Sequence, residues 1–393
     1  MTSDSSFDAG GFPGLLGDIL KMMRTDAPLQ WELAQQFAQN VASDGQPEPN
    51  VDPVQRMRFE ELARIAEMQV ADVTGMPATP SGAPVRFTTT GPAGWARRSL
   101  ESWRPIIERF AAAIRPATPG AEEGDDEEEA RDLARLMEQW SKAIAPAMIS
   151  LQVGSAIGHL ARTTLGQYEL PLPRREGDEI AVVPENAVRF AAEWSLNPDD
   201  AVLWVAARDL TMHTVLSRPH VRERFSQLLV EHAENLRPDL QSLVERLGEI
   251  SPGAIEDPSE LGELFGETGF GTDVDAPAAR RVRAELATLS AVLVGYAQWA
   301  TDAVATRAIG ARRPVFEAMR RRLVEMTDEE RAAEHLFGLD LSSETVDRGE
   351  AFVSGVLERG GEGEFAKLWV AAQNLPTPAE LDAPGLWIAR VNL

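Results

Sequence analysis

The residues that could carry metal or acid–base chemistry are few in this chain. It has no cysteine and only five histidines, which are His159, His213, His220, His232 and His335. Without cysteine there can be no disulfide, no thiolate metal site and no cysteine nucleophile. Zinc or general-base chemistry that needs an imidazole must therefore use one of these five side chains.

One histidine lies near a carboxylate at helical spacing. Asp209 and His213 are four residues apart in AVLWVAARDLTMHTVL (residues 201–216), so they share a face if this segment is a helix. The pair could hold a metal if a third ligand approached, and His220 and His232 are the nearest imidazoles. The alternative is an ordinary pair, bonded locally within the helix or facing solvent.

Other catalytic and binding signatures are missing. The sequence has no G-x-G-x-x-G after a strand, no Walker-type G-K-[ST] and no G-x-S-x-G, which disfavours nucleotide and serine-hydrolase chemistry. The net charge is −24, and an acidic chain repels phosphate backbones, so we expect no nucleic-acid partner. The basic run 320–322 is followed by acidic residues, which predicts a salt-bridged surface helix.

The secondary-structure elements that position these residues are predicted to be mostly helices. We predict helices at 12–23, 29–41, 52–74 and 95–114, a helix pair over 130–164, helices at 184–194 and 201–216, and mostly helices from there to residue 359. PVRFTTT (84–90) and EIAVVP (179–184) are strand candidates. Residues 374–393 look like a loop with a packed Trp387. The predicted fold class is mainly α with a small β element.

The chain divides most naturally near residue 164. We predict an N-terminal helical lobe at 1–164, with an acidic loop at 118–130, and a second helical lobe at 165–393 with a C-terminal extension; the two lobes could form one compact unit. Seven of the eight residues 122–129 are acidic, as in solvated loops. The most apolar stretch, 143–160, is short for a membrane span. With no signal peptide and no cysteine, we expect a cytoplasmic protein.

Several segments, in order, carry a resemblance to a known family. GSAIGHLARTTLGQYELPLP (154–173) resembles a glycine-rich helix followed by a Gly-Gln-Tyr-Asp turn, with Glu169 in place of the Asp. LVGYAQWATDAV (293–304) resembles a helix that starts Leu-Glu-Gly-Tyr. The Trp31 helix and segments 62–76, 336–341 and 375–391 extend the likeness. Together they resemble the zincin-like metallopeptidase family, also described as hydrolases or as deazaflavin-coenzyme-biosynthesis-associated proteins. The resemblance implies a zincin-like metallopeptidase-type fold.

The resemblance also implies where zinc would bind. A His-Glu-x-x-His helix supplies two ligands and the general base, and the Glu of Leu-Glu-Gly-Tyr supplies the third ligand. The matching positions here are Arg208, Asp209, Met212 and Val294. Arginine stays cationic, valine has no donor atom and a thioether is a poor zinc ligand. Asp209 keeps a carboxylate that is one methylene shorter. The zinc motif is therefore degenerate.

We expect a pseudoenzyme that binds a peptide or protein partner without a cofactor. The competing hypothesis is an active zinc-dependent hydrolase that uses a displaced site around Asp209 and His213, and a third is a purely structural scaffold. Tyr168 and Tyr296 lie in family-like motifs and are candidates to line the former cleft, between helices 204–216 and 289–304. Arg208 could replace the metal as a cation and hold an acidic pocket together by charge.

Overall fold

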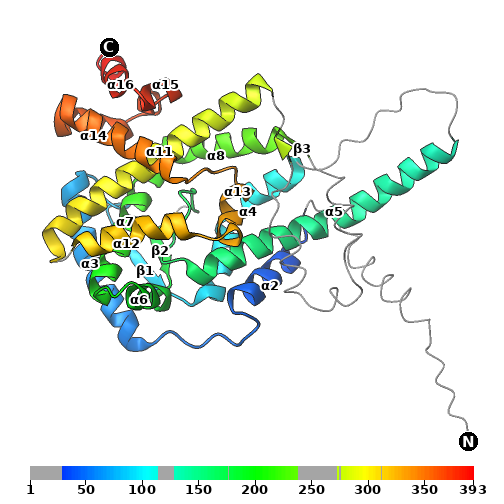
Figure 1. The fold of residues 1–393 in the computed structure, drawn as a ribbon, viewed down its shortest axis with the longest axis horizontal. Coiled ribbons are helices and arrows are strands. Elements are labelled where there is room, and N and C mark those ends of the chain that lie inside the picture. The colour runs from blue at the N-terminus through cyan, green and yellow to red at the C-terminus, as the bar shows by residue number, and fades with distance from the viewer. Residues whose placement is uncertain (1–28, 114–127, 176, 238–271, 274–275, 311) are drawn as a thin grey trace, which may run out of the picture.

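The computed structural model describes residues 29–113, 128–175, 177–237, 272–273, 276–310 and 312–393 (Figure 1). The predicted helix at 12–23 and residues 118–127 of the predicted acidic loop lie outside this part of the chain. The remaining residues of that loop begin a helix at Glu128.

The first half of the chain is a series of helices. They are α2 (Trp31–Ala42), α3 (Pro53–Thr74), α4 (Pro92–Ala113), α5 (Glu128–Thr163), α6 (Pro184–Glu193), α7 (Pro198–Leu216) and α8 (Pro219–Glu234). The start of α7 has a clear local cause, because the Asn197 side chain accepts a hydrogen bond from the backbone N–H of Asp199 at 2.9 Å. A proline in the first helical turn completes this start signal. Asp52 caps α3 in the same way.

The second half is also helical, up to the C-terminus. Its elements are α11 (Pro277–Ala308), α12 (Arg312–Glu325), α13 (Asp328–Leu336), α14 (Ser343–Phe365), η1 (Ala366–Trp369), η2 (Ala372–Asn374), α15 (Pro378–Leu381) and α16 (Pro384–Val391). The prediction of a loop over 374–393 is therefore wrong. Thr377 and Glu380 form a capping box that starts α15, and the buried Trp387 donates a hydrogen bond to the Asn374 carbonyl at 2.6 Å.

Two small sheets complete the described structure. Strands β1 (Arg86–Thr89) and β2 (Glu179–Val182) pair in parallel, with Arg86 opposite Glu179 and Thr89 opposite Val182. Strands β3 (Leu236–Arg237) and β4 (Thr272–Asp273) form a two-residue antiparallel pair. Both predicted strand segments are confirmed, as is the mainly α fold class with a small β element.

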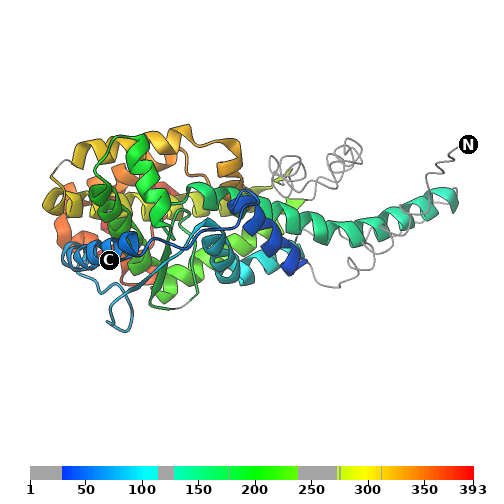
Figure 2. The ribbon, with the colours of Figure 1, turned by 90° about the horizontal axis from the view of Figure 1, so that it is seen from below.

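The predicted helix pair over 130–164 is wrong, because α5 is one continuous helix of 36 residues. It runs through Pro146, and its first half projects away from the other described helices (Figures 1 and 2). The second half packs closely on α2. A Cβ at Gly154 would lie 2.7 Å from the Ala34 carbonyl oxygen, and one at Gly158 would lie 2.6 Å from the Val41 Cβ. This close packing favours a continued helix beyond the proline.

The core lies around α7. One hydrophobic cluster has members all along the chain, from Leu29 to Trp387. Residues 201–216 of α7 are buried except Arg208, which is half-buried. Helices α3, α6, α11 and α12 pack against α7. Arg208 is thus held on a helix that other elements fix on several sides. The division into two lobes near residue 164 stays a prediction.

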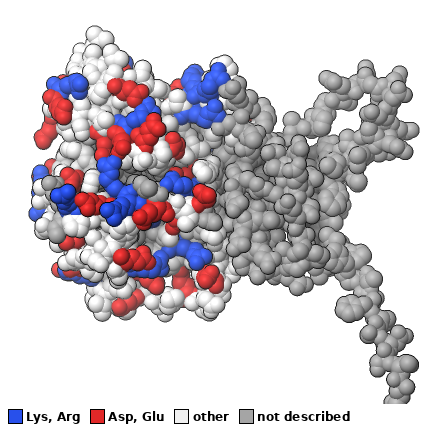
Figure 3. All heavy atoms as spheres, in the orientation of Figure 1, with Lys and Arg blue, Asp and Glu red and all other residues white. Residues whose placement is uncertain are grey.

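Helix length and surface charge concern the expectations of no membrane span and of no nucleic-acid partner. In the part of the chain that the structure describes, none of the helices combines the length and the apolar character that a bilayer crossing requires. Figure 3 shows basic and acidic side chains intermingled over the described residues of one face.

Candidate functional site

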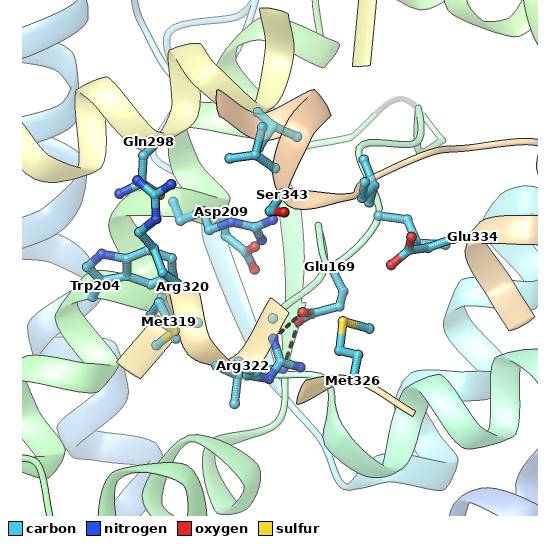
Figure 4. Close-up of a pocket in the computed structure, with 18 of the residues that line it drawn as sticks. Glu169, Trp204, Asp209, Gln298, Met319, Arg320, Arg322, Met326, Glu334 and Ser343 are labelled. Atoms are coloured by element: carbon cyan, nitrogen blue, oxygen red, sulfur yellow. Dashed lines mark hydrogen bonds and ion pairs between the residues drawn. The ribbon is translucent and has the colours of Figure 1, made fainter. Parts of the chain in front are cut away.

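A pocket lies beside Arg208, where α7 faces α11. It holds about 980 Å³ of space that is partly open to solvent. Its walls come from the 165–170 segment, α7, α11, α12, α13 and α14 (Figure 4). The two helices predicted to flank the former cleft, α7 and α11, both line it. The pocket therefore occupies the place where the resemblance implies a catalytic cleft.

One wall of the pocket is apolar. Trp204 of α7, Val294 of α11 and Met319 of α12 all line the pocket, and Figure 4 shows Trp204 and Met319 on the same side of the view. All three side chains are largely buried, with Val294 9% exposed. Such a wall suits an apolar side chain of a ligand, because contact with it removes apolar surface from water.

An ion pair closes another side of the pocket. The Arg322 guanidinium bonds the Glu169 carboxylate and also donates to the Thr163 carbonyl at 2.9 Å. Burial by itself raises the pKa of Glu169, but the charges of Arg322 and Arg208, together with hydrogen bonds from Arg322 and the Leu165 amide, hold that pKa below its usual value. Glu169 is therefore an anion at neutral pH, and it neutralises Arg322.

A second arginine and two further carboxyls line the same pocket. Arg320 bonds Asp347 and contacts Glu350 at 3.3 Å. Glu334 is buried, and burial raises its pKa to about 7 despite Arg331, which lies 3.8 Å away. Glu334 is therefore partly protonated near neutral pH.

Arg208 differs from these two arginines. Its Nη1 donates to the Tyr168 carbonyl at 2.8 Å, and no described carboxylate lies within ion-pair distance of it. Its charge still acts through space, because it lowers the pKa of both Glu169 and Asp209. The direct ion pair that would let Arg208 hold an acidic pocket together by charge is absent among the described residues, so this hypothesis stays a prediction.

Asp209 holds the turn that follows α5. Its carboxylate accepts hydrogen bonds from the backbone N–H of Gln167 at 2.6 Å and of Tyr168 at 3.1 Å. A Cβ at Gly166 would lie 2.1 Å from Oδ2 of Asp209, so glycine is required for this close approach. Burial raises the pKa of Asp209 to about 6, against the pull of Arg208 and the two amides. The carboxylate thus has a structural task.

His213, one helical turn after Asp209 on α7, also holds the 166–168 turn. Its Nδ1 and the Tyr168 hydroxyl share a buried hydrogen bond of 2.9 Å. Burial lowers the pKa of His213 to about 4, so the ring is neutral at pH 7. Asp209 and His213 therefore act on one turn and are not bonded to each other. Among the residues that the structure describes, no cluster of three or more His, Asp or Glu side chains could hold a metal ion.

The other predicted site residues lie outside the pocket lining, except Val294. Met212 is buried in the core, one turn beyond Arg208 on α7. Tyr168 is buried, and its hydroxyl is hydrogen-bonded to His213. Tyr296 packs in an aromatic cluster, with its ring 5.4 Å from Trp299 and 5.2 Å from both Phe365 and Trp369. The structure thus brings Arg208, Asp209 and Val294 together at the pocket.

Sequence reasoning missed the contribution of α12. Arg320 and Arg322 belong to the basic run interpreted as a surface helix, yet both line the pocket. Their neighbours Val315, Ala318 and Met319 are buried, so α12 turns an apolar side toward the core. That apolar pattern was the available signal that α12 packs inward.

Zinc does not fit the four implied positions. Arg208 carries a fixed positive charge into the pocket and Val294 offers no donor atom. Met212 would present a thioether, which zinc binds poorly, and Asp209 already accepts two amide hydrogens. The donor set lacks the three nitrogen or oxygen ligands that a catalytic zinc requires.

Comparisons with known proteins agree with the family resemblance and with the fold. The model of a family described as zincin-like metallopeptidase matches residues 29–388. The chain is similar to the crystal structure of a "putative hydrolase with a novel fold" from Chloroflexus aurantiacus, at 22% sequence identity and a TM-score of 0.61. The match covers 93% of this chain and 99% of that one, and at this identity it shows the fold alone. No curated protein sequence matches significantly.

Proposed function

This chain belongs to the zincin-like metallopeptidase family, and we propose that it is a pseudoenzyme that binds a peptide or protein segment in the pocket without zinc-dependent hydrolysis. The observation that carries this proposal is that Arg208 lines the pocket, at the residue that the resemblance places at the first zinc-ligand position. A cation at that position repels a metal ion. A reducing compartment such as the cytoplasm, predicted from the lack of cysteine, is part of the proposal.

The shape and chemistry of the pocket support binding. Its apolar wall adjoins charged side chains, a combination typical of ligand sites in which apolar contact gives affinity and a few polar groups give orientation. The competing hypothesis, a zinc-dependent hydrolase built on Asp209 and His213, would require both side chains to leave the 166–168 turn. Each would then abandon buried hydrogen bonds, which is costly.

A turnover and binding experiment tests this proposal. The untagged protein is incubated with an unbiased library of short peptides and added zinc, and cleavage is followed by mass spectrometry. Peptide binding is measured in parallel by equilibrium dialysis. We expect peptides to bind and none to be cleaved above the rate in a protein-free blank. Cleavage that is lost in Asp209→Asn would establish the hydrolase instead.

A plugging variant shows whether binding takes place in this pocket. Ser343 lies at the exposed start of α14 and lines the pocket (Figure 4), so Ser343→Trp should fill the opening without disturbing the core. Glu344 is also exposed but is not part of the lining, and Glu344→Trp is the matched control. Binding should be lost in Ser343→Trp and kept in Glu344→Trp.

A further inference from the structure

We propose that the ligand of this pocket is the C-terminal end of a peptide, with its terminal carboxylate bound by Arg208 and an apolar last side chain on the wall formed by Trp204, Val294 and Met319. The inference rests on the proposed function and names the ligand that this function requires.

Arg208 has the donors that such a carboxylate needs. A guanidinium has five N–H donors in a planar fork that matches a carboxylate with two parallel hydrogen bonds. In the described structure Arg208 uses Nη1 for the Tyr168 carbonyl and forms no ion pair. Its side chain is half-buried, so a bound carboxylate would be partly shielded from water, which strengthens the interaction.

The other two arginines of the pocket are already engaged. Arg322 is neutralised by Glu169 and Arg320 by Asp347 and Glu350. Among the described arginines that line the pocket, Arg208 is thus the one that forms no ion pair with a carboxylate. A ligand carboxylate can bind it without breaking an existing ion pair.

The surrounding charges favour a carboxylate over a phosphate. Four carboxyl side chains line the pocket together with the three arginines, namely Glu169, Asp209, Glu334 and Glu350. A dianion would be repelled by these groups more strongly than a single negative charge. A monoanionic carboxylate that pairs with one guanidinium fits this balance.

The shape of the pocket favours a chain end over a chain that passes through. A second cavity adjoins it, and the residues that line both cavities are Leu165, Arg322 and Met326. These residues lie at the boundary of the two cavities, and one of them, Arg322, is held there by Glu169 and the Thr163 carbonyl. In this proposal the peptide ends at that boundary, because an extended chain that continued would have to displace the ion pair of Arg322.

The experiment compares each peptide as a free acid and as its C-terminal amide. The probes are N-acetylated tripeptides ending in Leu, Val, Phe or Met, with octanoate as a carboxylate that is not a peptide. Dissociation constants are measured by isothermal titration calorimetry on the full chain. We expect the acid of the preferred peptide to bind on the order of 10- to 100-fold more tightly than its amide, as for a hydrogen bond to a charged group.

Arg208 variants assign this preference to one side chain. Arg208→Gln should abolish the difference between acid and amide. Arg313→Gln, which removes an exposed arginine of α12 (88% of its side chain is exposed), should leave the difference unchanged. Arg208→Lys keeps the charge but not the fork, so it should reduce the preference partially. Circular dichroism of each variant confirms that the fold is retained.

The outcomes separate this inference from the proposed function. Equal binding of acid and amide, lost in Ser343→Trp, would overturn the carboxylate inference and leave peptide binding in the pocket intact. Octanoate binding as tightly as the best peptide acid would overturn the peptide terminus as the ligand. No binding by any tripeptide, or binding that persists in Ser343→Trp, would overturn both proposals.

Discussion

At the scale of single residues, Asp209 has a different role in the structure from the one that the sequence predicted. The sequence indicated a shortened general base, and the structure places its carboxylate on the amides of Gln167 and Tyr168. His213 likewise bonds Tyr168. Spacing along a helix could predict that Asp209 and His213 share a face. Their bonding partners, however, lie 41 to 45 residues earlier in the chain, and a pattern within one helix carries no information about them.

The buried carboxyl of Asp209 predicts a pH dependence of stability. Its pKa is raised from 3.8 to about 6 in the folded protein, so folding favours its protonated form. The contribution is fully present below the unfolded pKa and is lost as the pH rises from about 4 through 6. The loss is on the order of 3 kcal/mol, at 1.36 kcal/mol per pKa unit.

Asp209→Asn removes this titration. The unfolding free energies of wild type and variant, measured by urea denaturation between pH 4 and 7, should therefore differ by an amount that changes with pH. Wild type should lose stability relative to the variant as the pH rises. Glu32→Gln, which removes an exposed carboxylate, controls for the loss of one charge. A difference that stays constant with pH would refute the buried, raised-pKa state of Asp209.

At the scale of elements, the pocket depends on how closely α11 and α14 approach. A Cβ at Gly349 would lie 1.9 Å from the Ala291 carbonyl oxygen, and one at Gly295 would lie 2.4 Å from the Gly349 carbonyl carbon. Gly295 stands next to Val294, so this crossing sets the position of the apolar wall. Most helices, including α3 and α7, were predictable from caps and apolar periodicity. The crossing of α11 with α14 was not, because it depends on contacts distant in sequence.

Gly349→Ala should therefore be strongly destabilising. The added methyl group cannot be accommodated without moving one helix backbone, and overpacking of this kind costs roughly 1–3 kcal/mol or more. Gly363→Ala, which lies in α14 beyond its kink at Gly361, is the control, because nothing lies within 4 Å of its Cβ position. Its unfolding free energy should not fall and should rise by at most roughly 1 kcal/mol, because a helix favours Ala over Gly. Thermal and urea unfolding of both variants would check this, and equal effects would contradict the close crossing.

At the scale of the whole molecule, the family resemblance predicted more of the structure than local sequence patterns did. The order of weak motifs along the chain predicted the family, which the match over residues 29–388 confirms. The same frame located the pocket between α7 and α11, but not the α12 side chains Arg320 and Arg322 that enclose it. Charge runs such as 320–322 usually face solvent, and Arg321 does so here. Arg322 is largely buried, because α12 packs against α7.

The central proposal is that this member of the family binds no zinc at the positions where the resemblance places the zinc ligands. The most direct measurement is the zinc content, by elemental analysis, of untagged wild type beside a variant with Arg208→His, Asp209→Glu, Met212→His and Val294→Glu. We predict essentially no zinc in wild type and about one zinc per chain in the variant, since two histidines and a glutamate form a catalytic zinc site. About one zinc in wild type, lost in Asp209→Ala or His213→Ala, would contradict the claim.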